Sequence, residues 1–392
     1  MKAKVKVGVV TGSRADYGLL YPLIKLLRDE PQFDLCLIVT GQHLSYEFGY
    51  TIDEVKNDGF KVDKLVETLL SSDSCVGVTK STGLGLIGFA DAYSDLKPDL
   101  VIILGDRYES FAAAIAAYFA KIPIVHLHGG ELTEGLIDDA IRPSITKMSF
   151  FHCVSTEAYR KRVIQLGEHP ERVFTCGALG IDNILNETLL GKSELESELG
   201  ITFGHRNILV TYHPVTLENN TSEQQFASIL EVLSSFDIDR FFFTKPNADI
   251  YGKVIIKMID DYVKMNSGRA FSFESLGRKR YLSMLKYVNC VMGNSSSGII
   301  EVPSFGIPSI DVGDRQKGRI AAESVIRCGT DDSSIYHAIE KALSRDFAAH
   351  CKSVKNPYGD GHAAERILKI LADYTGSLSD VKKSFYDIEF TV

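Results

Sequence analysis

Short apolar runs alternate with amphipathic stretches along almost the whole 392-residue chain. Several runs are continuously apolar, as expected for strands buried on both faces of a parallel sheet. The predicted strands are Val5–Thr11, Leu35–Thr40, Leu100–Gly105, Ile124–His128, His152–Ser155, Ile208–Tyr212, Phe241–Thr244, Cys290–Met292 and Ser309–Val312. Strands that alternate with helices indicate an α/β fold with right-handed crossovers.

Helical periodicity fills most of the intervals between these strands. The predicted helices are Tyr17–Arg28, Glu109–Ala120, Ala158–Leu166, Asp182–Leu190, Glu194–Leu199, Glu223–Ser235, Val254–Met265, Tyr281–Lys286 and Ile335–Leu343. A new series of strands begins after the stretch 178–206, which Gly191 and Gly200 interrupt. We therefore predict two doubly wound, Rossmann-like domains with a cleft between them, residues 1–180 and 181–369.

Ligands of such sheets bind beyond the carboxyl ends of the strands, so the residues that follow each strand are the candidates. In the first domain, the glycine turn Thr11–Arg14 opens a helix, where Arg14 could hold an anion. Asp106 and Arg107 follow the most apolar strand. The alternatives are an ordinary turn at Arg14 and a helix-capping Asp106 with a solvated Arg107.

The next strand leads into His126-Leu127-His128-Gly129-Gly130-Glu131, and Asp138 and Asp139 follow. Strand alternation predicts that His126 and His128 share one face. Several carboxylates and a histidine favour general acid–base chemistry. A metal site would need a third ligand that no spacing fixes, so we predict no metal. A polar loop with core histidines is the remaining alternative.

The second domain offers an anion site. His213 follows one strand, and Lys245 to Asp249 follow the next. Ser295 and Ser296 lie in the Ser-rich turn of Gly293–Glu301, which suits a diphosphate, and Glu301 suits ribose hydroxyls. Arg315 is one of three cations in the loop 313–319. Capping serines and a solvated basic loop are the alternatives.

The composition of the chain limits the classes of partner that it can bind. The chain has 43 Lys and Arg against 51 Asp and Glu, a net charge of −8, whereas a general nucleic-acid binder would be basic. No apolar run approaches the roughly 20 residues of a membrane span. Seven cysteines without C-x-x-C spacing indicate reduced thiols in a cytoplasmic protein. Because Trp is absent, Leu276, Phe271 and Phe273 are the candidates to pack against a nucleobase.

Taken together, these stretches resemble the hydrolysing UDP-N-acetylglucosamine 2-epimerases of bacterial sialic and nonulosonic acid biosynthesis. The resemblance is carried by TGSRADYG (11–18), LGDRYE (104–109), HLHGGE (126–131), IDDAIRPSITKMS (137–149), RVIQLGE (162–168), GNSSSGIIEVPSFG (293–306), GDRQKGR (313–319) and SFYDI (384–388). It implies a GT-B architecture with UDP in the C-terminal domain. It further implies a tail, 370–392, that packs back on the first domain, and a homodimer or homotetramer.

The resemblance also implies the chemistry. A base removes the C2 proton while UDP leaves C1, and water then adds to the 2-acetamidoglycal to give N-acetylmannosamine. The implied UDP contacts are Arg14, Arg107, His213, Asn247, Ser295, Ser296, Glu301 and Arg315. The implied catalytic acids are Asp106 and Asp138, with no metal and no cofactor.

The sequence departs from the family pattern at two places, and the roles of the acid–base residues are therefore open. His128 stands where the animal branch has its catalytic Glu, and Glu131 follows three residues later. The acid–base assignment is therefore open among His128, Glu131, Asp138 and Asp139. Pro143 stands where the family often has a histidine.

We expect UDP-N-acetylglucosamine as the substrate. The same motifs fit UDP-N,N'-diacetylbacillosamine, whose C4 and C6 groups differ. A non-hydrolysing epimerase, a GT-B glycosyltransferase and a UDP-sugar sensor are the remaining alternatives, and the product of the reaction separates them.

Overall fold

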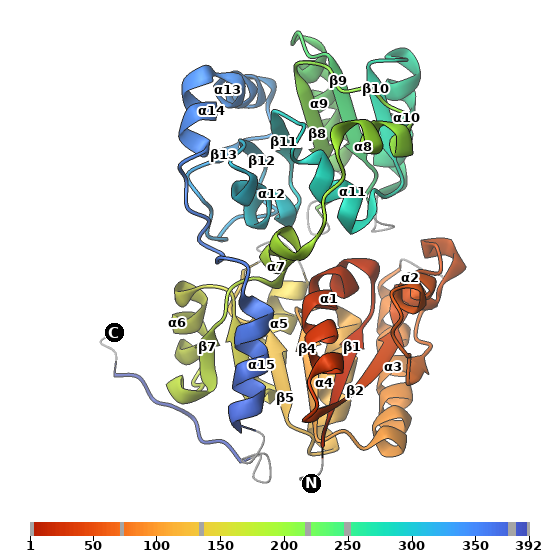
Figure 1. The fold of residues 1–392 in the computed structure, drawn as a ribbon, viewed down its shortest axis with the longest axis vertical. Helices are drawn as coiled ribbons and strands as arrows, with labels where there is room; N and C mark the ends of the chain where they lie inside the picture. Colours follow the sequence, from red (N-terminus) through yellow and green to blue (C-terminus); the bar gives the residue numbers. More distant parts are fainter. Residues whose placement is uncertain are drawn as a thin grey trace. The chain divides into compact units, whose positions relative to one another are not determined.

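The computed structural model describes residues 4–70, 74–132, 137–215, 221–246, 252–374 and 382–389. The chain divides into two compact units (Figure 1). Unit 1 comprises residues 1–131, 137–183 and 358–392, and unit 2 comprises residues 132–136 and 184–357.

Unit 1 is built on a seven-stranded parallel sheet with the order β3-β2-β1-β4-β5-β6-β7. Its strands are β1 (Val5–Thr11), β2 (Phe33–Thr40), β3 (Lys64–Val66), β4 (Leu100–Leu104), β5 (Ile124–Leu127), β6 (Phe151–Val154) and β7 (Val173–Thr175). Its helices are α1 (Arg14–Asp29), α2 (Ile52–Asn57), α3 (Cys75–Leu96), α4 (Tyr108–Phe119), α5 (Asp138–Met148), α6 (Glu157–Gln165) and α15 (Ala363–Tyr374), and α7 (Leu179–Asn186) leads out of it.

Strand alternation divides the core of unit 1 into two layers. Val7 and Val9 of β1 pack in one layer with α1 and α15, and Val10 packs in the other with α3 and α4. Both layers are apolar, which explains why all five residues of the central strand β4 are hydrophobic.

Unit 2 repeats this plan with a six-stranded parallel sheet, order β10-β9-β8-β11-β12-β13. The strands are β8 (Asn207–Thr211), β9 (Arg240–Thr244), β10 (Ala270–Phe273), β11 (Cys290–Gly293), β12 (Ser309–Val312) and β13 (Val325–Cys328). The helices are α8 (Lys192–Leu199), α9 (Ser222–Ser234), α10 (Gly252–Met265), α11 (Gly277–Met284), α12 (Ser296–Ile300), α13 (Asp332–Leu343) and α14 (Arg345–Cys351). Short 3₁₀ segments lie at Gly41–Leu44, Tyr46–Phe48, Pro170–Arg172 and Val302–Phe305. The predicted α/β class with two Rossmann-like sheets is confirmed.

The chain returns to unit 1 earlier than the sequence predicts. The resemblance implies a tail of residues 370–392 on the first domain, whereas unit 1 resumes at Tyr358, and α15 packs against α1. The predicted boundary at 180 lies inside α7, and the units divide after Asn183.

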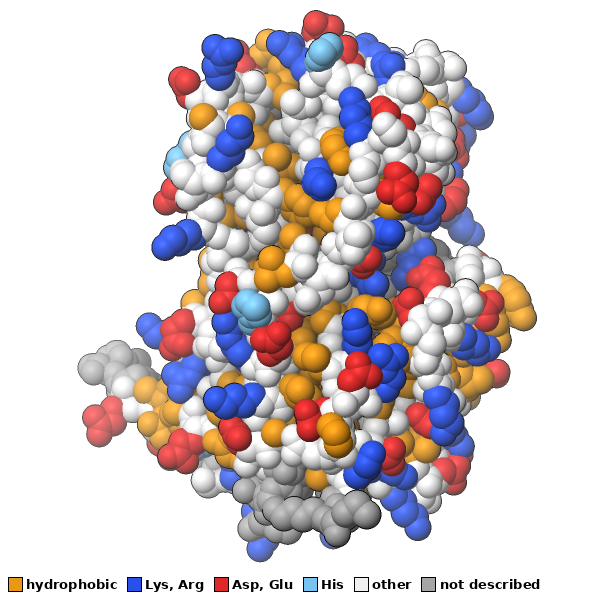
Figure 2. All heavy atoms as spheres, viewed as in Figure 1, with side chains coloured by type: hydrophobic (Ala, Val, Ile, Leu, Met, Phe, Trp, Pro, Cys, Tyr) orange, Lys and Arg blue, Asp and Glu red, His pale blue; other side chains and the backbone are white. Residues whose placement is uncertain are grey.

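Charged side chains of both signs are interspersed on the visible face of each unit (Figure 2). Among the described residues, no helix has the length and apolar character needed to cross a membrane.

Candidate active site

In unit 1 the turn after β1 is organised by Asp16. Ser13 caps α1, its side-chain oxygen accepting the Asp16 N–H, while the Asp16 carboxylate accepts the Gly12 N–H at 3.1 Å and the Ser13 hydroxyl at 2.8 Å. Arg14 lies at the start of the helix with its side chain 39% exposed, 3.8 Å from Glu54. The turn therefore presents Arg14 rather than Asp16 to a ligand.

Arg107 belongs to a second charged pair at the end of β4. It caps α4, and its Nε donates to Glu109 Oε2 at 3.3 Å. Glu109 is buried and also lies close to Gly12 and Gly41, so it joins the ends of β1, β2 and β4.

Asp106 is not the N-cap of α4, because Arg107 occupies that position, and it forms an ion pair with the buried Arg142 of α5. The same guanidinium donates to the backbone oxygen of His128 at 2.8 Å. Arg142 therefore fixes the loops after β4 and β5 to each other and holds Asp106 beside His128.

His128 and Glu131 form a buried pair. His128 Nδ1 lies 2.9 Å from Glu131 Oε1, which also accepts the Ser155 hydroxyl at 2.9 Å. His128 Nε2 has no hydrogen-bond partner among the described residues. The carboxylate therefore fixes the orientation of the ring and leaves Nε2 for a ligand or a proton.

The two histidines of this loop have different environments. β5 ends at Leu127 and His128 has a φ of +63°, so strand alternation does not set the direction of its side chain. His126 is fully buried between Gly105 O and the Thr146 hydroxyl, and burial lowers its pKa to about 3. His126 is thus a neutral core residue. Asp138 and Asp139 lie partly exposed in the first turn of α5.

In unit 2 a second cluster forms where β8, β11 and β12 end. Asn294 joins it: its amide donates to His213 O and accepts the His213 N–H, both at 2.7 Å. Arg315 Nη1 and Gln316 Nε2 donate to Asn294 O at 3.0 and 2.8 Å. Burial lowers the pKa of His213 to about 3, so a neutral imidazole lies beside the Arg315 cation.

The Ser-rich turn connects this cluster to α12. Ser295 caps the helix and Ser296 begins it. The Ser297 hydroxyl contacts Glu301 and the phenol of Tyr281. Burial raises the pKa of Glu301 to about 7, although the hydrogen bond from Ser297 lowers it.

Gly293 lets this turn lie directly against β8. Its φ is +142°, and a Cβ there would lie 1.8 Å from the backbone oxygen of Thr211. Only glycine fits at this position.

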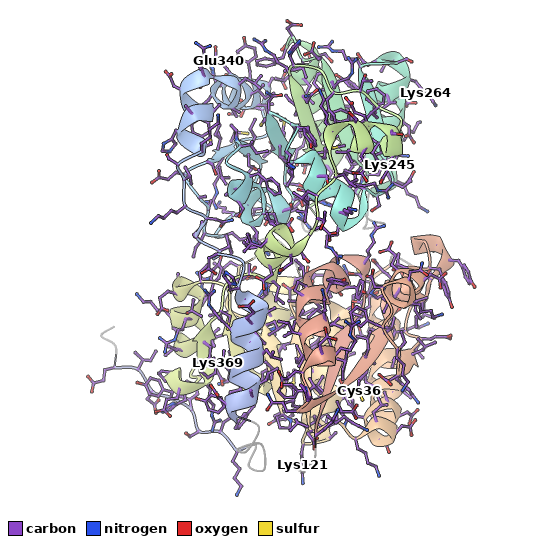
Figure 3. The ribbon with its side chains drawn as sticks, viewed as in Figure 1. Cys36, Lys121, Lys245, Lys264, Glu340 and Lys369 are labelled. Carbon is purple, nitrogen blue, oxygen red and sulfur yellow. The ribbon has the colours of Figure 1, made fainter. Side chains whose placement is uncertain are left out.

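Two predicted residues of unit 2, Lys245 and Leu276, have their contacts outside this cluster. Lys245, labelled in Figure 3, forms ion pairs with Asp260 at 3.0 Å and Glu274 at 2.6 Å. Asn247 lies outside the described residues. The side chain of Leu276 is buried in the apolar cluster of Phe242 and Leu282, so its contact with a nucleobase stays a prediction.

Several site residues were not singled out from the sequence. Arg142, Ser155, Asn294 and Gln316 hold the candidate residues in place. Arg142, Asn294 and Gln316 lie inside the quoted motifs, but nothing in their spacing shows which loop each one contacts. No group of three or more His, Cys, Asp or Glu that could hold a metal occurs among the residues described.

Comparison with known proteins identifies the family of this chain and several similar proteins. Residues 25–372 match the family model of UDP-N-acetylglucosamine 2-epimerase. The chain is 40% identical over 386 residues to the hydrolysing GDP/UDP-N,N'-diacetylbacillosamine 2-epimerase of Campylobacter jejuni, covering 98% of this chain and 100% of that relative. It is 39% identical to polysialic acid biosynthesis protein P7 of Escherichia coli, covering 98% and 97%.

A solved structure shows the same fold. The crystal structure of UDP-GlcNAc 2-epimerase from Neisseria meningitidis, bound to UDP-GlcNAc, matches with a TM-score of 0.80 and 21% identity, covering 94% of this chain and 100% of that one. This likeness supports the predicted GT-B type fold.

Proposed function

Because the chain belongs to the UDP-N-acetylglucosamine 2-epimerase family, we propose that it hydrolyses UDP-N-acetylglucosamine to N-acetylmannosamine and UDP. The observation that carries the proposal is the buried network Asp106–Arg142–His128–Glu131, which places two carboxylates and an imidazole at the ends of β4 and β5. A protein that only bound a diphosphate would gain little from acids near it.

Unit 2 would bind the nucleotide. Arg315 supplies a cation, Ser295 and Ser296 supply hydroxyl and backbone donors at the start of α12, and Glu301 can accept ribose hydroxyls. In unit 1, Arg14 and Arg107 add cations for the diphosphate. Positive groups that stabilise the departing UDP lower the barrier to cleavage of the C1–O bond.

Unit 1 would move the protons. We assign the base to the His128–Glu131 pair, because Glu131 holds Nδ1 and leaves Nε2 without a partner among the described residues. The base takes the C2 proton, the C1–O bond to UDP breaks, and a 2-acetamidoglycal forms. Water then adds its hydroxyl to C1, and a proton returns to the opposite face of C2 from an acid among Asp106, Asp138 and Asp139.

A second substrate is supported by the relative from C. jejuni, whose name gives N,N'-diacetylbacillosamine as the sugar. The reaction would be the same, with an acetamido group at C4 and a methyl group at C6.

Proton NMR in D₂O tests both substrates in parallel tubes. Free UDP with N-acetylmannosamine deuterated at C2 is the expected result for UDP-N-acetylglucosamine. Turnover in the tube with the diacetylbacillosamine nucleotide, and not in the other, would show that this nucleotide is the substrate. A UDP-sugar product would indicate a non-hydrolysing epimerase, and no turnover in either tube would reject the reaction.

We also propose a biosynthetic role and a cellular compartment for this protein. The name of the polysialic acid protein supports a role in making sialic-acid-type sugars, and we extend this proposal to capsule polysaccharide. Seven free cysteines suit a reducing cytoplasm.

We further propose a homodimer, or a tetramer built from it, through α3. Val76, Lys80, Leu84, Ile87 and Asp91 form one exposed stripe on this helix, and Val76 and Ile87 are 63% and 66% exposed. An antiparallel copy of α3 would place Leu84 against Ile87 and Lys80 against Asp91. This self-complementary pattern of charge and apolar surface favours a second copy over an unrelated partner.

A further inference from the structure

Three segments that belong to the sequence motifs have no role in the proposed reaction, and they contact one another in unit 1. They are the end of 137–149, the turn that closes 162–168, and the segment 384–388 near the C-terminus. Residues 382–389 run as an extended segment beside α6 and β7 (Figure 1). We call residues 382–389 the tail clamp.

The centre of the contact is a buried carboxylate. Glu168 is 1% exposed and accepts hydrogen bonds from Lys147 Nζ at 2.6 Å and Lys383 Nζ at 2.7 Å. His152 Nε2 lies 3.1 Å from the same carboxylate. Lys383 also donates to Ser149 O at 2.8 Å. One lysine of the tail thus connects Glu168 to the end of α5.

An aromatic residue completes the contact. The Tyr386 N–H donates to Gly167 O at 2.9 Å, and the Phe385 ring lies over Gly167. A Cβ at Gly167 would lie 2.1 Å from that ring, so glycine makes room for it. Lys147 Nζ lies 5.1 Å from the centre of the Phe385 ring, within the range of a cation–π contact.

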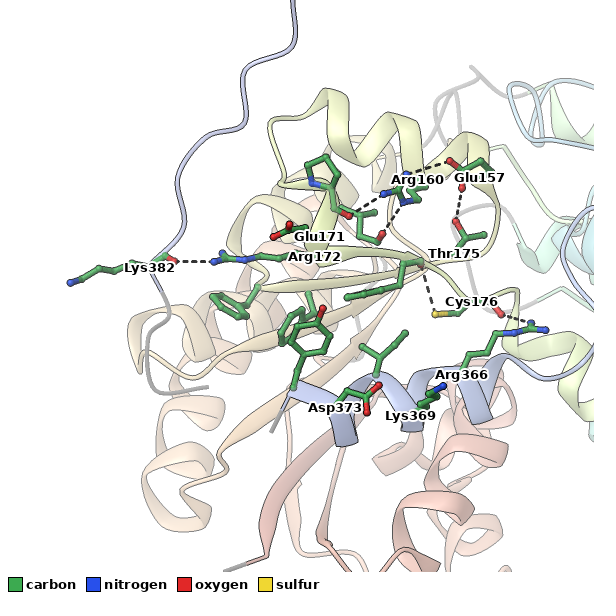
Figure 4. A pocket seen from close by; sticks show the side chains of 17 residues that line it. Glu157, Arg160, Glu171, Arg172, Thr175, Cys176, Arg366, Lys369, Asp373 and Lys382 are labelled. Carbon is green, nitrogen blue, oxygen red and sulfur yellow. Dashed lines mark hydrogen bonds and ion pairs between the residues drawn. The ribbon is translucent and has the colours of Figure 1, made fainter. Parts of the chain in front are cut away.

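The tail clamp borders an open groove. This groove, about 1060 Å³ in volume, lies among β7, α15 and Lys382 (Figure 4). Arg172 donates to Lys382 O at 3.5 Å along its edge. None of the candidate site residues lines the groove, so the clamp and the groove are separate from the proposed chemistry.

Helix α5 joins the tail clamp to the candidate active site. Lys147 and Ser149 lie at its C-terminal end, whereas Asp138 and Arg142 lie toward its N-terminal end. The helix has 11 residues, so about 16 Å separates its ends. Helix α5 is the continuous segment that connects these two ends, and Pro143, which lies between Arg142 and Lys147, lacks the backbone N–H that would donate within the helix.

We propose that the tail clamp fixes the C-terminal end of α5 through Glu168 and so positions Arg142, and with it Asp106 and His128, for catalysis. Lys383 and Phe385 are then positioning residues that act about one helix length from the reacting groups. The inference rests on the proposed function and adds to it a structural requirement at the C-terminus.

The test compares the full chain with a chain that ends at residue 381. Removing the clamp is expected to lower kcat about 10- to 100-fold, as for a small misplacement of catalytic groups. KM and the Kd of UDP are expected to stay within about 2-fold, because most of the nucleotide contacts belong to unit 2. A synthetic peptide of residues 382–392, added near the roughly 1 mM effective concentration of a short tether, should restore kcat in a saturable manner.

Matched variants distinguish positioning from general stabilisation. In the full chain, Lys383→Met and Phe385→Ala should each lower kcat, Lys383→Arg should retain it, and the exposed Ser384→Ala should leave it unchanged. A peptide carrying Lys383→Met and Phe385→Ala should not rescue the shortened enzyme. Full kcat in the shortened chain, or a bound peptide that restores nothing, would overturn the proposal.

Hydrogen exchange separates this inference from the proposed function. Removing the tail is expected to speed exchange of the α5 amides, residues 138–148, and to leave β11 and α12 unchanged. An enzyme inactive on both UDP-sugars would reject the proposed function, yet faster exchange in α5 would still support the clamp. Unchanged exchange in α5 would reject the clamp whatever the activity. If the shortened chain does not fold, the Lys383→Met chain takes its place in both measurements.

Discussion

The Asp106–Arg142 pair shows how one side chain can combine support and chemistry. The guanidinium binds the carboxylate with one nitrogen and the backbone of His128 with another. The sequence predicts Asp106 from its place after a strand, but Arg142 lies 36 residues away and only the fold brings the two together.

Asp106→Asn is expected to lower kcat by about 10²- to 10⁴-fold, as for loss of a group that acts in proton transfer. The Kd of UDP should change by less than about 2-fold, because we assign Asp106 to proton transfer and not to the contacts with UDP. Steady-state kinetics and calorimetry measure the two quantities. An unchanged kcat would remove Asp106 from the mechanism.

His128→Gln and Glu131→Gln test the assignment of the base. If His128 Nε2 takes the C2 proton, His128→Gln loses at least about 100-fold in exchange of the C2 proton with D₂O. Glu131→Gln should lose less, because the ring remains and only its orientation is weakened. The reverse order would assign the base to Glu131.

Arg315→Ala is expected to weaken UDP binding about 10- to 100-fold, the loss of a charge-assisted hydrogen bond worth about 1.5–3 kcal/mol. Lys317→Ala is the control, because Lys317 lies in the same loop, 3.6 Å from Asp314, with its side chain 59% exposed. Equal effects of the two substitutions on UDP affinity would indicate a general electrostatic effect rather than a specific contact.

Whole elements differ in how clearly the sequence predicts them. β1 and β12 have the predicted bounds, because each ends directly before a glycine turn, at Gly12 and Gly313. Helix α3 was not predicted, since apolar residues lie around much of its surface and Gly83, Gly85 and Gly88 interrupt the pattern. β3 and β7 are three residues long, too short for a periodicity signal.

Glu301, which follows helix α12, makes the free energy of unfolding depend on pH. Its pKa of about 7 lies above its ordinary value of 4.5, so the folded protein binds this proton more tightly than the unfolded chain does. Stability is therefore lost as the pH rises from about 4.5 to 7. Glu301→Gln should be about 3 kcal/mol more stable than the wild type at pH 8 and close to it near pH 4.5. Urea unfolding at both values measures the difference, and equal stability at pH 8 would contradict the buried carboxylate.

The whole molecule follows the predicted plan of two Rossmann-like units, because alternation of strand and helix is a signal that extends over the chain. The positions of the divisions could not be predicted as well. The return to unit 1 at Tyr358 depends on the packing of α15 against α1, and nothing local in the sequence marks it.

The proposed dimer can be measured on the intact chain. Light scattering is expected to give two or four times the chain mass of 43.3 kDa. Ile87→Asp should shift the protein toward the single-chain mass, because it places a charge in the apolar part of the stripe on α3. Val254→Asp, at an exposed position on α10 of unit 2, is the matched control and should leave the mass unchanged.

The return of the chain at Tyr358 has a consequence for synthesis on the ribosome. Unit 2 is complete in the nascent chain once residue 357 has emerged, whereas unit 1 still lacks α15 and the tail. Domains fold as units while they are made, so unit 2, to which we assign the nucleotide, can form before unit 1 is finished. A chain released after residue 357 would then contain all of unit 2 but only part of unit 1.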